Sequence, residues 1–115
     1  MTETLARDRS TWRALLEAIT RGRRGEHATL EVLDDGLGDQ VEARDLPLES
    51  LDFDERADTV IVALDGRTAG AGVVLRHLVE HPLRLDVLEQ PHGSLVLRIV
   101  GASGAQTLLT CRPAA

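Results

Sequence analysis

Residues 83–112 read LRLDVLEQPHGSLVLRIVGASGAQTLLTCR, and this stretch decides the fold class. It contains apolar runs of strand length that are separated by short polar or glycine-containing turns. The runs are residues 83–89, 94–100 and 105–112, and the turns are Pro91-His92-Gly93 and residues 101–104. Because short connections make neighbouring strands antiparallel, the stretch predicts an antiparallel sheet.

The chain before this stretch contains further strand patterns. Residues 27–33 and 40–44 alternate apolar and polar side chains on the two sides of Asp34-Asp35-Gly36, a turn signal. Residues 59–64 are nearly all apolar and predict a central strand. With the downstream runs, they predict a sheet of six to seven strands.

Two segments have helical spacing. In residues 10–21, the apolar side chains form one stripe that predicts a helix covering one side of the sheet: Trp12, Leu15, Leu16 and Ile19. A second short helix is predicted near residues 72–81, after a glycine-rich loop and before Pro82. We therefore expect a single α+β domain over residues 1–115, with a curled, mainly antiparallel sheet and flexible residues 1–9.

The composition excludes several classes of function. The chain has 115 residues, 43% of them hydrophobic, which is enough for one core. All thirteen basic residues are arginine, so Schiff-base chemistry on lysine is absent. Cys111 is the one cysteine, which excludes an intramolecular disulfide and favours a buried apolar role. No apolar stretch approaches the roughly 20 residues of a membrane span, so we expect a cytoplasmic protein without membrane contact.

Charge is unevenly distributed along the chain. Residues 1–25 have a balance of +3, residues 26–66 of −11 and residues 67–115 of +2. This order disfavours nucleic-acid binding, which needs a coherent basic surface. It favours self-association or a protein partner, with a solvated set of acidic turns as the simpler alternative.

His77-Leu78-Val79-Glu80-His81 fits H-x-x-E-H, the inverted zinc-protease motif. On a helix, the two histidines would bind zinc one turn apart and Glu80 would act as general base. Pro82 follows directly, and the chain is small for a substrate cleft. Histidines at a helix end, with Arg76 and Glu80 as an ordinary ion pair, are the alternative. His77, Glu80 and His81 are therefore the metal candidates, without an assigned metal or cofactor.

Arginine provides the candidates for binding a partner or an anion. Arg21, Arg23 and Arg24 form the one basic cluster, and Arg76 lies in the second predicted helix. These guanidinium groups could bind phosphate or an acidic protein surface. Stabilisation of a helix C-terminus by positive charge is the alternative for the cluster.

Two other patterns fail as ligand motifs. The acids of residues 52–58 lack the oxygen ligand and the glycine that an EF-hand loop needs at Arg56 and Ala57. The glycines of residues 66–72 lack the spacing and the lysine of a phosphate-binding loop. We assign no catalytic and no cofactor-binding residue.

Four short motifs carry a resemblance to a known family. They are Arg9–Trp12–Arg13, Leu37-Gly38-Asp39-Gln40, Leu46-Pro47-Leu48 with Leu51–Asp54, and Leu75-Arg76-His77 with Glu80-His81-Pro82. Over nearly its whole length the chain resembles an uncharacterised bacterial family, domain of unknown function 5335. The resemblance implies no activity and no site residues, but it suggests that residues 75–82 form a local unit.

The sequence thus favours a non-enzymatic protein-interaction module, which we expect to be a homodimer. The alternative is a small-ligand or metal-binding domain, with hydrolase activity as one form of it, centred on His77, Glu80 and His81.

Overall fold

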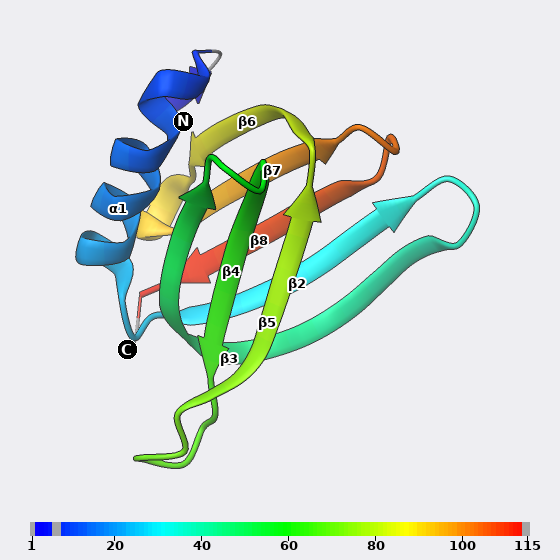
Figure 1. Ribbon diagram of the computed structural model, residues 1–115. Helices are drawn as coiled ribbons and strands as arrows, with labels where there is room; N and C mark the ends of the chain where they lie inside the picture. Colours follow the sequence, from blue (N-terminus) through cyan, green and yellow to red (C-terminus); the bar gives the residue numbers. More distant parts are fainter. Residues whose placement is uncertain (1, 6–7, 114–115) are drawn as a thin grey trace.

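The computed structural model describes residues 2–5 and 8–113, which form eight strands, one α-helix and two 3-10 turns (Figure 1). In chain order, the elements are β1 (Thr2–Leu5), η1 (Arg9–Thr11), α1 (Trp12–Arg23), β2 (His27–Asp34), β3 (Gly38–Asp54), β4 (Thr59–Asp65), β5 (Val73–Glu80), β6 (Pro82–Glu89), η2 (Pro91–Gly93), β7 (Leu95–Gly101) and β8 (Gln106–Arg112).

The strands form one sheet in the order β1-β6-β7-β8-β2-β3-β4-β5, and every pair is antiparallel. The long strand β3 curls this sheet, because its first half pairs with β2 and its second half with β4. Figure 1 shows β3, β4 and β5 crossing in front of the other strands, so the sheet folds over into two layers. His77 of β5 consequently contacts Thr107 of β8, although the two strands are not neighbours in the sheet.

The core lies between these layers and beneath α1. Trp12 and Leu16 are completely buried on the inner face of the helix, as the apolar stripe predicts. The Trp12 and Phe53 rings meet edge to face, with their centroids 5.3 Å apart. Strands β6, β7 and β8 add alternate apolar side chains to the same cluster, including Leu85, Leu97 and Leu109. One helix and one curled sheet therefore share one core.

The structure confirms the α+β class, the antiparallel sheet and the N-terminal helix. The second short helix predicted near residues 72–81 is wrong, because Val73–Glu80 form strand β5. Its alternate residues Leu75 and Val79 pack towards the core, and pairing with β4 satisfies its backbone. The short strand β1 was also missed, and the sheet has eight strands instead of six to seven. Of the segment expected to be flexible, residues 1, 6 and 7 lie outside the described part of the chain.

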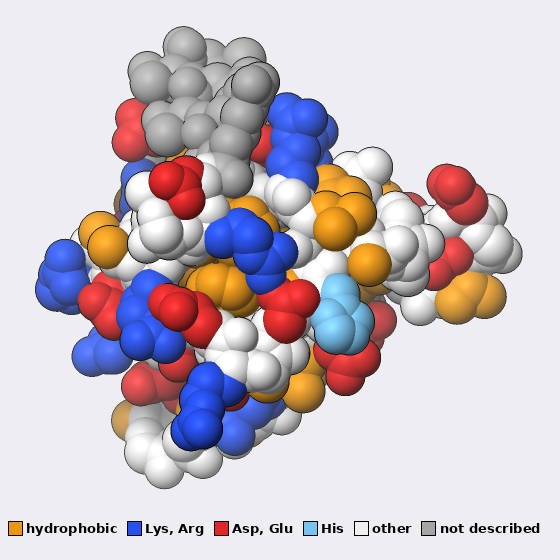
Figure 2. Space-filling view, turned by 45° about the horizontal axis from the view of Figure 1, so that its top comes forward, with side chains coloured by type: hydrophobic (Ala, Val, Ile, Leu, Met, Phe, Trp, Pro, Cys, Tyr) orange, Lys and Arg blue, Asp and Glu red, His pale blue; other side chains and the backbone are white. Residues whose placement is uncertain are grey.

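Folding removes the separation of charge seen along the sequence. Arg9 and Arg13, from the basic N-terminal segment, pair with Asp58 and Glu55 of the acidic middle. Arg112 reaches the acidic middle from the other end of the chain. Figure 2 shows positive and negative side chains mingled over one face of the molecule, with apolar patches between them. The chain's three charge segments therefore do not become three charged surfaces.

Candidate functional site

The residues of the zinc-protease pattern lie at the end of β5 and just beyond it. Along a strand, two residues four positions apart are separated by about 13 Å, whereas in a helix they lie one turn apart on the same face. The helical geometry that the zinc-protease pattern requires is therefore absent. His77 Nε2 lies 3.2 Å from Thr107 Oγ1, whereas His81 Nδ1 lies 3.1 Å from Asp58 Oδ2. Within residues 2–5 and 8–113, no three His, Cys, Asp or Glu side chains are grouped to hold a metal ion.

His77, Glu80 and His81 nevertheless border the same pocket. It lies between β5 and the turn that joins β7 to β8, and it has a volume of about 330 Å³. Burial lowers the pKa of His77, and the negative charge of Glu42 only partly opposes this effect. The imidazole of His77 is therefore neutral at pH 7 and shares a hydrogen bond with the Thr107 hydroxyl.

The predicted basic cluster is divided among different contacts at the end of α1. Arg23 donates to Glu26 Oε1 at 3.1 Å and to the Gly93 carbonyl, and Arg24 Nε donates to the Glu49 carbonyl at 3.0 Å. Arg21 is exposed and borders a shallow pocket with Arg24, where Glu17 and Asp52 balance the positive charge. Arg23 thus connects the end of α1 to Glu26 and Gly93, and anion binding by the cluster stays a prediction.

Arg76 lies instead on the outer surface of β5. Alternation along the strand exposes four side chains, which we call the β5 outer face: Val74, Arg76, Leu78 and Glu80. Leu78 is 50% exposed and Val74 57% exposed. Neither Arg76 nor Glu80 forms an ion pair with any described residue. Two uncompensated, opposite charges therefore flank an exposed leucine.

This surface also lies at a boundary of the sheet. β5 is the last strand in the order and pairs only with β4. Ile61 of β4 stands directly beside Leu78 in the strand register and is half-buried, which extends the apolar centre of the surface by one strand. Exposed apolar side chains grouped at a sheet edge are typical of interaction sites.

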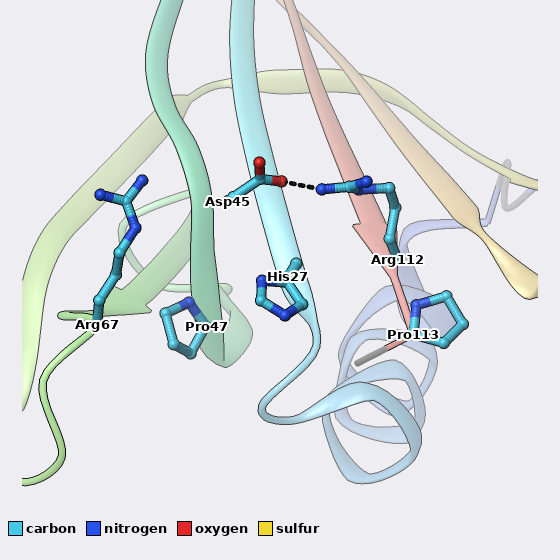
Figure 3. A pocket seen from close by; sticks show the side chains of 6 residues that line it. All are labelled: His27, Asp45, Pro47, Arg67, Arg112 and Pro113. Carbon is cyan, nitrogen blue, oxygen red and sulfur yellow. Dashed lines mark hydrogen bonds and ion pairs between the residues drawn. The ribbon is translucent and has the colours of Figure 1, made fainter. Parts of the chain in front are cut away.

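A second site lies where β3 passes from one layer of the sheet to the other. Figure 3 shows six side chains that line a pocket there: His27, Asp45, Pro47, Arg67, Arg112 and Pro113. The cavity volume is about 520 Å³. His27 stands between Pro47 and Arg112 in the register of three adjacent strands, and Arg67 approaches from the loop between β4 and β5.

An irregularity in β3 positions Asp45 in this pocket. The pairing of β2 with β3 shifts register between Ala28 and Leu30, which leaves an extra residue in β3. Asp45 has a φ of 53°, which a non-glycine residue seldom adopts. The Asp45 N–H donates to Thr29 Oγ1 at 3.2 Å, and Arg112 donates to the Asp45 carboxylate. The hydrogen bond from Arg112 is the main reason why the pKa of Asp45 is lowered, so this carboxylate is ionised at neutral pH.

Sequence reasoning missed every residue of this second pocket. Asp45 and Arg112 are 67 positions apart, and no local motif connects them. The one available signal was Pro47, which interrupts the alternation of the strand and marks the bend of β3.

Across the described residues, no helix combines the length and apolar character that crossing a membrane requires.

Comparisons with known proteins identify a relative and a family for this chain. An uncharacterized protein of Aquifex aeolicus (strain VF5) is 26% identical over 111 residues, which cover 96% of this chain and 94% of that protein. None of the solved structures matches the chain. The family match extends over residues 1–115, so the chain belongs to the Family of unknown function (DUF5335).

Proposed function

We propose that this protein is a non-enzymatic protein-interaction module that acts as a homodimer, with the β5 outer faces of two copies in contact. The observation that carries the proposal is the arrangement of Leu78 between Arg76 and Glu80, all three exposed and the two charges unpaired among the described residues. The proposal includes a cytoplasmic location.

The order Arg76, Leu78, Glu80 along β5 lets this surface pair with the same surface of a second copy. In a two-fold symmetric interface, a residue on the axis contacts its own copy, and residues on either side of it exchange contacts. An axis through Leu78 places Leu78 against Leu78 of the second copy. It also places Arg76 of each copy against Glu80 of the other copy, which gives two ion pairs.

Other positions of the axis are less favourable. An axis through Arg76 or Glu80 would bring like charges together, which opposes association. With the axis at Leu78, the apolar centre is formed by Leu78 and the neighbouring Ile61, and the charged pairs lie at its rim. This is the usual organisation of a protein interface, with an apolar centre and a polar rim.

Charge reversal tests the proposal in solution. Sedimentation velocity should find a dimer for the unmodified chain and a monomer for Arg76→Glu and for Glu80→Arg, because each change places like charges together. The double variant Arg76→Glu/Glu80→Arg should restore the dimer. Arg56→Glu makes the same charge change on an exposed turn and is the matched control, which should remain dimeric.

A monomeric unmodified chain would overturn the proposal. A double variant that stays monomeric while its circular dichroism matches that of the unmodified chain would also overturn it. Swapping the two charges should restore the ion pairs between the Arg76 and Glu80 positions of the two copies, and with them the dimer.

A further inference from the structure

The pocket in Figure 3 has a cationic character that the whole chain lacks. Arg67 and Arg112 contribute two positive charges, His27 contributes an imidazole N–H donor, and Asp45 contributes one negative charge. The chain as a whole has a net charge of −6. A pocket of opposite sign on an acidic protein concentrates anions locally.

One contact to each arginine holds its side chain in place. Arg67 donates through Nη2 to the Arg44 carbonyl at 2.6 Å, which anchors the loop residue beside β3. Arg112 donates to the Asp45 carboxylate, as the dashed line in Figure 3 shows. A guanidinium group has five N–H donors, so each of these contacts leaves donors for a ligand. Figure 3 also shows Arg67 and Arg112 on opposite sides of the pocket, with His27 and Pro47 between them.

Asp45 fixes the position of Arg112 in the pocket and does not exclude an anion from it. Its left-handed backbone is held by the hydrogen bond of its N–H to Thr29 and by the ion pair to Arg112. Such backbone strain persists where the surrounding contacts fix it, and it is concentrated at functional sites. The result is a guanidinium group whose position is set before a ligand arrives, which reduces the entropy lost on binding.

We propose that this pocket binds a small molecule through its oxyanion, a carboxylate or a phosphate group. Arg67 and Arg112 bind the oxyanion from two sides, and the imidazole of His27 donates a further hydrogen bond. Arginine suits this role because its planar donors match the geometry of both groups. The rings of Pro47 and Pro113 provide apolar walls for the rest of the ligand.

NMR titration at constant ionic strength tests the site, with inorganic phosphate and succinate as two separate probes. At least one probe should give saturable shifts at the amides of residues 27, 45 and 67, and the stronger response identifies the oxyanion class. Arg67→Ala should weaken this binding by about tenfold or more, the effect of losing a charged hydrogen bond. Arg56→Ala removes an arginine from a different turn and should leave the binding unchanged.

Asp45→Asn separates the electrostatic role of Asp45 from its structural one. Asparagine tolerates a positive φ and keeps an oxygen acceptor for Arg112, but it removes the negative charge. Binding of the same probe should therefore become tighter. Unchanged or weaker binding by Asp45→Asn would contradict the electrostatic account. The site itself is overturned if neither probe gives saturable shifts, or if Arg67→Ala binds like the unmodified chain.

Discussion

At the scale of single residues, Asp86 is the most completely buried charged side chain in the described part of the protein. Its side chain is 1% exposed and lies on β6, where Arg84 donates to both of its oxygens and Arg98 donates to Oδ2. Burial alone would raise the pKa of Asp86, but the hydrogen bonds from the two arginines outweigh it and lower the pKa. This carboxylate therefore joins Arg84 of β6 to Arg98 of β7.

Asp86→Asn should lower the free energy of unfolding by about 2–3 kcal/mol at neutral pH, because charged hydrogen bonds to both arginines weaken. A carboxyl group with a lowered folded-state pKa stabilises the fold above its unfolded pKa of about 3.9, and this stability is lost as the pH falls through the folded pKa. The variant should therefore lose less stability than the unmodified chain between about pH 5 and about pH 2. Urea unfolding followed by Trp12 fluorescence measures both effects, and equal acid sensitivity in the two proteins would refute this role.

Cys111 is expected to be unreactive in the folded protein. The side chain is completely buried in β8, and this burial raises the pKa of its thiol to about 11. Since the thiolate is the reactive form, modification by a disulfide reagent near pH 8 should be more than about tenfold slower in the native protein than in denaturant. Equal rates in native and denatured protein would mean that β8 opens readily.

At the scale of secondary-structure elements, Thr20 connects α1 to the sheet. Its hydroxyl accepts from the Leu51 N–H at 2.9 Å and donates to the Leu16 carbonyl at 2.8 Å. Thr20→Val keeps the shape but leaves a buried N–H without an acceptor, which should cost about 1–3 kcal/mol. Thr20→Ser retains the hydroxyl and serves as the control. Chemical denaturation of the two variants should separate them by at least about 1 kcal/mol, and similar stabilities would show that the hydroxyl does not hold the helix.

The secondary-structure elements differ in how well the sequence predicts them. Strands β6, β7 and β8 were predictable because they are apolar runs of strand length separated by short turns, and α1 because its apolar side chains form one stripe of helical period. β5 was not predictable, because it has apolar side chains on both faces. Leu75 and Val79 point to the core while Val74 and Leu78 are exposed, and together these four match helical spacing. The strand assignment comes from pairing with β4, a long-range contact.

The candidate sites also differ in whether their residues lie within one segment of the sequence or are brought together by long-range contacts. The sequence singled out Arg76 as a candidate for binding a partner or an anion and Glu80 as a metal candidate, with a helical ion pair between them as the alternative. The fold exposes both side chains on β5. It could not predict the pocket at Asp45, whose residues come from β2, β3, β8 and the loop after β4. The register shift that points Asp45 towards Arg112 depends on how two strands meet, and no single segment encodes it.

At the scale of the whole molecule, the curled sheet separates two surfaces with different chemistry. The β5 outer face is apolar with balanced charges, whereas the pocket at the bend of β3 is cationic. Dimerisation through the β5 outer face should depend on salt, since its charged rim is screened at high ionic strength. Sedimentation equilibrium should find a weaker dimer in high salt, and stronger association there would indicate that apolar contacts alone hold the two copies.

The most direct test of the dimer is cross-linking at its proposed symmetry axis. Leu78→Cys should form a disulfide between two copies on mild oxidation, because the axis places this position against itself. Val74→Cys, on the same face and comparably exposed, is the control and should cross-link much more slowly. Rapid dimer formation by Leu78→Cys alone is the predicted result on a non-reducing gel. Equal rates for the two variants, or no cross-linking of Leu78→Cys, would contradict the homodimer proposed here.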